Sequence, residues 1–146
     1  MSEHAASNFI SSARRTVKME ADAVAELEQR IGEDFARACE LLLATPGRVI
    51  VTGMGKSGHI ANKVAATLAS TGTPSFYVHP GEASHGDMGM ITADDSVLAL
   101  SNSGSTPELL TLLPLLKRQG NTLISMTGNP ASELAKASDA HLDSSV

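Results

Sequence analysis

Residues 48–58 read Arg-Val-Ile-Val-Thr-Gly-Met-Gly-Lys-Ser-Gly, a short β-branched run that enters a glycine-rich loop. A short, uninterrupted apolar run is typical of a strand that is buried on both faces of a parallel sheet. The small-residue stretch 59–70 that follows predicts a helix. This segment therefore predicts a strand–loop–helix unit whose loop and helix N-terminus can bind an anion.

The same kind of unit recurs along the rest of the chain. A second glycine- and hydroxyl-rich loop, residues 101–106, also lies between a predicted strand and a predicted helix, 107–119. Further strands are predicted at 75–78, 97–100, 121–126 and 140–142. Repeated units of this kind predict an α/β fold with three layers, in which a doubly wound parallel sheet of about five strands resembles that of flavodoxin. Right-handed crossovers bring both loops to the same sheet edge.

The first 46 residues are predicted to be helical. Apolar residues recur every three to four positions between Val17 and Ile31, Gly32 divides the segment into two helices, and Pro46 ends the second. We expect one domain over residues 1–146, with a helical segment at 1–46 and an α/β core at 47–146. The apolar face of the first helix predicts a homo-oligomer.

The composition excludes several classes of protein. A net charge of −5, a pI of about 5.4 and an aromatic content of 3% argue against a nucleic-acid partner. No apolar run approaches the ~20 residues of a membrane helix, and the start shows no secretory signal. We therefore expect a cytoplasmic protein without a membrane partner. Cys39, the only cysteine, is expected to be buried, and Cys39, His59 and His141 are expected to be structural.

The first loop fits two nucleotide motifs poorly. Gly53, Gly55 and Gly58 match the G-x-G-x-x-G pattern of dinucleotide-binding folds, but the second strand ends in Val-His-Pro where that pattern needs an acidic residue. A Walker loop needs a further glycine at the position of Ile50, inside the strand. We therefore expect no nucleotide cofactor.

Lys56 is the residue in this loop that a simple turn does not explain. A lysine at this sheet edge is costly to bury without an anionic partner. Lys56 and the adjacent Ser57 therefore predict a compact phosphate ligand.

The second loop reads Ser-Asn-Ser-Gly-Ser-Thr and carries four hydroxyls within six residues. Alternating hydroxyls and backbone N–H groups can form a nest that binds the oxygens of one phosphate. Two interpretations of Glu108, in the first turn of the following helix, stay open. It either completes a capping box with Ser105 or serves as a functional carboxylate.

The segment 79–87 between the two loops is unusually polar. It holds two histidines and two carboxylates, but Pro80-Gly81 breaks any helical spacing and no zinc pattern is matched, so we expect no metal. We expect a loop that closes over the ligand, with His79, Glu82 and His85 as candidate substrate contacts.

Several of these stretches resemble the sugar isomerase (SIS) domain family of phosphosugar-binding proteins and, within it, the bacterial arabinose 5-phosphate isomerases. The resemblance covers nearly the whole chain. The segments that carry it are VTGMGKSGHIANK at 51–63, HPGEASHGDMGMI at 79–91, SNSGSTPEL at 101–109 and ISMTGNP at 124–130.

The resemblance implies interconversion of D-ribulose 5-phosphate and D-arabinose 5-phosphate through an enediol(ate), in the supply of the Kdo sugar of lipopolysaccharide. It implies catalytic roles for Lys56 and Glu108. An enediol(ate) mechanism needs a base and a group that stabilises the developing oxyanion, and we assign Glu108 as the base and Lys56 as the stabiliser, with the reverse assignment left open. It also implies that phosphate and substrate contact Gly55, Ser57, Ser101, Asn102, Ser103, Gly104, Ser105 and Thr106.

Members of the family continue beyond Val146 with a further glutamate and histidine of the site, and many add a pair of CBS domains. We therefore expect a truncated domain that binds phosphosugar but turns it over poorly. The resemblance implies a homo-oligomer, either a dimer or a tetramer, without metal or cofactor. The alternative is a non-catalytic SIS phosphosugar sensor, which needs the hydroxyl loop but no base.

Overall fold

The structure is a computed structural model that describes residues 3–84 and 86–146. These residues divide into two compact units, one up to Gly32 together with Val146, the other Glu33–Ser145. Among them, no helix is both long enough and apolar enough to span a bilayer.

The first unit contains α1 (Glu3–Leu27) and a 3-10 helix, η1 (Glu28–Arg30). The predicted helix, and its end before Gly32, are confirmed. Large apolar side chains along α1 are exposed, and Val17 and Val24 are each 67% exposed.

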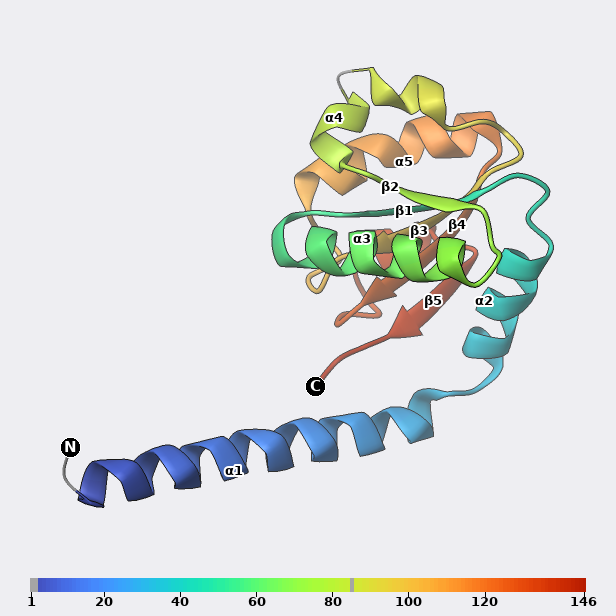
Figure 1. Ribbon diagram of the computed structural model, residues 1–146. Helices are drawn as coiled ribbons and strands as arrows, with labels where there is room; N and C mark the ends of the chain where they lie inside the picture. Colours follow the sequence, from blue (N-terminus) through green and yellow to red (C-terminus); the bar gives the residue numbers. More distant parts are fainter. Residues whose placement is uncertain (1–2, 85) are drawn as a thin grey trace. The chain divides into compact units, whose positions relative to one another are not determined.

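The second unit is a three-layer α/β fold, as predicted (Figure 1). Its five-stranded parallel sheet has the order β2-β1-β3-β4-β5. The strands are β1 (Val49–Gly53), β2 (Ser75–Val78), β3 (Ser96–Leu100), β4 (Thr122–Thr127) and β5 (Ala140–Asp143). The helices are α2 (Glu33–Leu43), α3 (Gly55–Ser70), α4 (Pro80–Ser84), α5 (Pro107–Gln119) and α6 (Glu133–Ala137), with a 3-10 helix η2 (Asp87–Met90).

Alternating strand residues build one apolar core on each face of the sheet. Ile50 faces a cluster with residues of α4, α5 and α6, including Leu112. Val49 and Val51 face a cluster with α2 and α3, including the small residue Ala65. Continuous apolar runs are required here because helices cover both faces of the sheet.

Three expectations are corrected by the structure. The helix after β1 begins at Gly55 rather than at His59. Pro80 does not break helical spacing but begins α4, since proline fits the first position of a helix. Cys39 is half-buried rather than buried, because only one side of α2 packs against the α/β core.

The amino ends of β1 and β3 are held by an ion pair that we call the Arg48–Asp95 clasp. Asp95 is 2% exposed and accepts hydrogen bonds from the Arg48 backbone N–H (2.8 Å), from its Nε (3.1 Å) and Nη2 (2.8 Å), and from the Thr92 N–H (2.8 Å). The guanidinium also stacks 4.9 Å from the ring centre of Phe76. Burial acts to raise the pKa of Asp95, but these hydrogen bonds outweigh it and lower the pKa to about 2.

Candidate functional site

The two loops meet where the strand order reverses. β1 and β3 are neighbours, but α3 and α5, which follow them, cover opposite faces of the sheet. Such a switch point opens a crevice at the carboxyl ends of the strands, and this is the usual ligand site of doubly wound folds. A cavity of about 200 Å³ lies there. It is lined by Lys56, Ser57, Ile60, Leu100, Ser101, Asn102, Met126 and Ser144.

The glycines of the first loop allow α3 to begin very close to β1. Gly55 has φ +56°, in the left-handed region that favours glycine. A Cβ on Gly58 would lie 2.7 Å from the Gly53 carbonyl oxygen and 2.8 Å from the Tyr77 hydroxyl, which itself donates to that oxygen (2.9 Å). Burial raises the pKa of Tyr77, and the charge of Glu82 adds to this, so the hydroxyl stays a donor.

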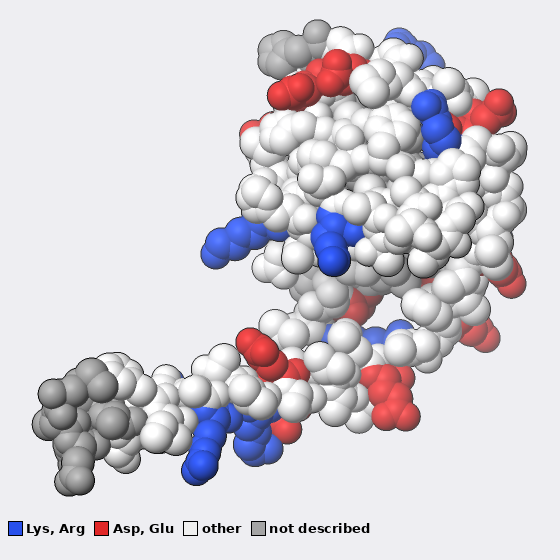
Figure 2. Space-filling model, viewed as in Figure 1, with Lys and Arg blue, Asp and Glu red and all other residues white. Residues whose placement is uncertain are grey.

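Lys56 is exposed, and Ser57 is half-buried. The expectation that Lys56 is buried and therefore needs an anionic partner is wrong, because the residue lies in the first turn of α3 with its side chain in solvent. The cation still stands at the rim of the cavity. Figure 2 shows basic side chains projecting from a largely uncharged surface over α3, whose lysines Lys56 and Lys63 are both exposed.

Hydroxyls of the second loop form hydrogen bonds within the loop and so stabilise its shape. The Ser101 side chain is buried, lies 2.7 Å from the Thr106 hydroxyl, and accepts the Gly104 N–H (3.1 Å). The Ser103 hydroxyl accepts the Ser105 N–H (3.2 Å). Gly104 has φ +63° and leaves no room for a Cβ beside the Ser132 side chain. The loop therefore has a defined shape before any ligand binds.

The start of α5 bears on the capping-box interpretation of Glu108. Thr106 rather than Ser105 is the N-cap residue, Pro107 follows it, and the Thr106 side chain makes no capping hydrogen bond within the described chain. The capping-box interpretation is therefore wrong. Glu108 is half-buried in the first turn of α5, the helix that follows the hydroxyl loop.

The segment between the loops lies outside the cavity wall, as far as it is described. His79 is half-buried, its ring is edge-on to Tyr77 at 6.5 Å, and its buried Nδ1 has no partner in the described structure. Glu82 is exposed in α4, and His85 lies outside the described residues. His59 is exposed, whereas His141 is hydrogen-bonded within the fold. No three potential metal-ligating side chains gather within 3–84 and 86–146.

Of the residues predicted from the sequence, the cavity wall includes Lys56, Ser57, Ser101 and Asn102. The other described candidates, Glu108 among them, do not line it. Sequence reasoning missed Ile60, Leu100, Met126 and Ser144. Ile60 lies one helical turn after Lys56, and this spacing could have indicated it. Ser144 reaches the site only because β5 pairs with β4.

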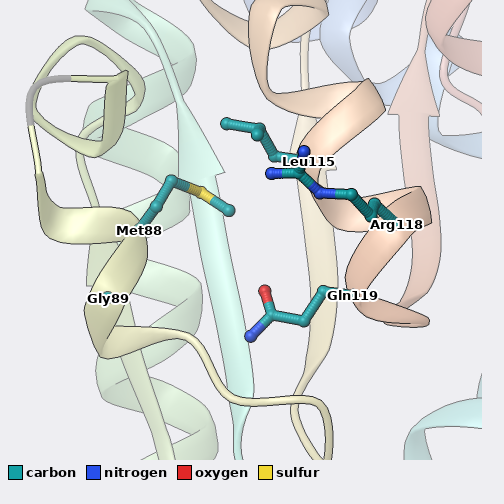
Figure 3. A pocket seen from close by; sticks show the side chains of 5 residues that line it. All are labelled: Met88, Gly89, Leu115, Arg118 and Gln119. Carbon is teal, nitrogen blue, oxygen red and sulfur yellow. The ribbon is translucent and has the colours of Figure 1, made fainter.

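Larger hollows lie elsewhere on the second unit. One of about 370 Å³ lies between η2 and α5, with Met88 and Leu115 turned toward each other and Arg118 beside them (Figure 3). Another, of about 590 Å³, lies between α5 and α6. A further one, of about 290 Å³, lies between the end of α5 and the start of β4. None of these is lined by residues of the two loops, so we assign the site to the smaller cavity, where a helix start, hydroxyls and a cation converge.

The sheet order defines a domain of the doubly wound α/β class, in which small molecules usually bind at such a crevice. The SIS domain family matches residues 42–146 of the sequence, and the chain belongs to this family.

Similar proteins include two arabinose 5-phosphate isomerases named KdsD. The one from Pseudomonas aeruginosa is 72% identical over 139 residues, which cover 95% of this chain and 43% of the relative. The one from Escherichia coli K12 is 52% identical over 135 residues, 92% of this chain and 41% of the relative. The chain thus spans less than half the length of these relatives.

A solved structure of an Escherichia coli CFT073 protein in complex with A5P superposes with a TM-score of 0.92. It is 44% identical, and the match covers 100% of this chain and 76% of that chain.

Proposed function

We propose that this chain is the sugar-phosphate-binding domain of an arabinose 5-phosphate isomerase. The observation that carries the proposal is the cavity at the β1/β3 switch point, with Lys56 and Ser57 on one rim and Ser101 and Asn102 on the other. The likeness to relatives that are named arabinose 5-phosphate isomerases supports D-arabinose 5-phosphate and D-ribulose 5-phosphate as the ligands.

The phosphate is proposed to bind between the starts of α3 and α5. The first turn of each helix presents backbone N–H groups and the positive end of a helix dipole. Ser57 on the first rim and the 101–106 loop on the second add hydroxyl and amide donors, and the exposed Lys56 adds a cation. This combination of donors suits a compact dianion.

Isomerisation moves a proton between the two carbons that exchange the carbonyl group. A base removes the proton next to the carbonyl, an enediol(ate) forms, and the same proton is returned to the neighbouring carbon. We assign Glu108 as this base, because it stands beside the hydroxyl loop and is not engaged in a capping box. Lys56 is assigned to stabilise the negative oxygen of the intermediate.

The isomerase activity is proposed for the whole protein. The matched relatives are more than twice as long as the aligned region, so these residues alone are proposed to bind sugar phosphate and to turn it over poorly. We also propose that residues 1–146 act as one domain of a dimer or tetramer in the cytoplasm, where the product serves Kdo and lipopolysaccharide synthesis. The exposed apolar side chains of α1 support association with further copies, and the names of the relatives support the reaction class.

Glu108→Gln in the full-length protein tests the catalytic assignment. Loss of the base is expected to lower kcat by about 10²–10⁴-fold, while the affinity for arabinose 5-phosphate measured by calorimetry is retained. Glu133→Gln is the matched control, since Glu133 is an exposed first-turn glutamate of α6 away from the cavity.

Unchanged turnover in Glu108→Gln contradicts the assignment of Glu108 as the base. A full-length wild-type protein that binds the sugar but has no turnover favours the phosphosugar sensor.

The ligand class is tested on this chain by thermal unfolding. Arabinose 5-phosphate is expected to raise the melting temperature more than glucosamine 6-phosphate or NAD at equal concentration, because a ligand that binds only the folded state stabilises it. A larger shift with NAD contradicts the proposed function.

A further inference from the structure

The turn that follows β4 is held by a hydroxyl whose hydrogen-bonding capacity is fully used. Thr127 is completely buried, and its Oγ1 donates to the Asn129 carbonyl (2.9 Å) and accepts the Asn129 N–H (3.1 Å). The same oxygen lies 2.9 Å from His141 Nε2, on β5. A hydroxyl can donate one hydrogen bond and accept two.

The contacts of Thr127 bear on which nitrogen of the His141 ring carries a proton. We assign the single hydroxyl proton of Thr127 to the Asn129 carbonyl. On this assignment the contact with His141 is a hydrogen bond in which Nε2 carries a proton and donates it. His141 therefore connects the edge strand β5 to the turn 127–129.

The turn 127–129 contacts a residue of the candidate site. The Gly128 N–H donates to the Asn102 carbonyl (2.9 Å). A Cβ on Gly128 would lie 2.6 Å from Asn102 Oδ1, so the Asn102 side chain occupies the space that only glycine leaves there. Asn102 is exposed and lines the cavity, whereas Gly128, Thr127 and His141 do not line it.

We propose that His141 and Gly128 are positioning residues for the sugar-phosphate site. His141 bonds to Thr127, Thr127 bonds to the turn, and Gly128 bonds to the backbone of Asn102 and leaves room for its side chain in the cavity wall. The inference rests on the proposed function for its ligand, and on hydrogen bonds within the fold for its structural part.

The test compares His141→Leu with His141→Gln in this chain. Leucine removes the donor and leaves one of the two acceptor positions of the buried Thr127 hydroxyl unfilled, so the turn loses its bond to β5 and the Kd for arabinose 5-phosphate is expected to rise roughly tenfold. Glutamine carries an amide N–H donor and is expected to stay within about threefold of wild type. Gly128→Ala is expected to raise the Kd at least as much as His141→Leu. Gly89→Ala is the control, because a Cβ there has open space.

A structural readout accompanies binding. In the free wild-type chain, ¹⁵N NMR is expected to show a proton on His141 Nε2, and the Gly128 amide is expected to exchange slowly with solvent. In His141→Leu the Gly128 amide is expected to exchange faster and the Asn102 amide signal to move. This readout needs no ligand and therefore separates failure of the inference from failure of the proposed function.

Three results overturn the inference. One is an unprotonated Nε2 in the neutral His141 ring of the wild type. Another is equal loss of affinity in the glutamine and leucine variants, and the third is unchanged exchange at Gly128 and unchanged affinity in His141→Leu. If the wild type binds inorganic phosphate but not arabinose 5-phosphate, the proposed function fails, and the same variants are compared by their affinity for inorganic phosphate.

Discussion

At Gly58 a single methyl group is enough to disturb the start of α3. The Cβ of an alanine would lie 2.7 Å from the Gly53 carbonyl oxygen, which is backbone and cannot turn away. Lys56 and Ser57 are carried by the same first turn. The shape of this cavity rim therefore depends on a residue that does not line it.

Gly58→Ala is expected to destabilise the fold by about 1–3 kcal/mol, because overpacking forces the helix away from β1. Urea unfolding measures the loss. Gly89→Ala, where nothing lies within 4 Å of the added Cβ, is expected to change stability by less than about 0.5 kcal/mol. Equal stability of the wild type and Gly58→Ala would show that the helix start shifts without cost.

The types of residue in the two loops could be used to predict a candidate site, whereas their exposure and hydrogen bonds could not. The hydroxyls of 101–106 and the glycines of 53–58 predict phosphate-binding loops, because hydroxyls and exposed backbone N–H groups are donors to phosphate oxygens. The exposure of Lys56 could not be predicted, since it depends on where the first helical turn points. The pairing of the Ser101 and Thr106 hydroxyls likewise depends on backbone geometry rather than composition.

At the scale of elements, the five strands and the start of α5 at Pro107 were predictable, whereas the starts of α3 and α4 were not. Short β-branched and apolar runs mark β1 to β5, and each appears within one or two residues of its predicted place. The N-cap of α3 is Met54, which offers no capping side chain, so the sequence held no signal for its start. α4 is five residues long and too short for an apolar period to show.

α6 does have a capping signal. Ser132 is buried and its hydroxyl accepts the Ala135 N–H (3.3 Å), while Ala135 and Leu134 pack inward. Ser132→Ala is expected to lower stability by about 1 kcal/mol, as measured by urea unfolding. Ser70→Ala, at an exposed serine in the last turn of α3, serves as the control and is expected to stay within about 0.5 kcal/mol of wild type. A loss no larger than in the control would mean that packing alone fixes α6.

At the scale of the whole chain, doubly wound topology was predictable because repeated strand–loop–helix units allow few other arrangements. The division after Gly32 was not expected, since the apolar spacing of the first helix gives no information on whether it contacts the α/β core.

The stability of the α/β unit toward acid is expected to depend on Asp95. Its pKa of about 2 in the folded chain lies below the 3.8 of an ordinary Asp, so ionisation favours folding. The contribution, about 2 kcal/mol, is complete above pH 3.8 and is lost as the pH falls toward 2. Asp95→Asn is expected to be less stable than wild type at pH 7, and the difference in urea unfolding is expected to shrink near pH 2.5. A difference that does not change with pH would exclude the ion pair as its cause.

The clasp and the cavity lie at opposite ends of the same strands. β1 has five residues, which at about 3.3 Å each separate the two ends by roughly 15 Å. Substitutions around the ligand therefore leave the charge pair intact, and substitutions at the charge pair leave the ligand contacts in place. A chain built this way can exchange exposed residues at the cavity rim during evolution while the ion pair secures the other end of the strands. The glycines behind the rim, Gly58, Gly104 and Gly128, do not share this freedom, because a Cβ there has no room.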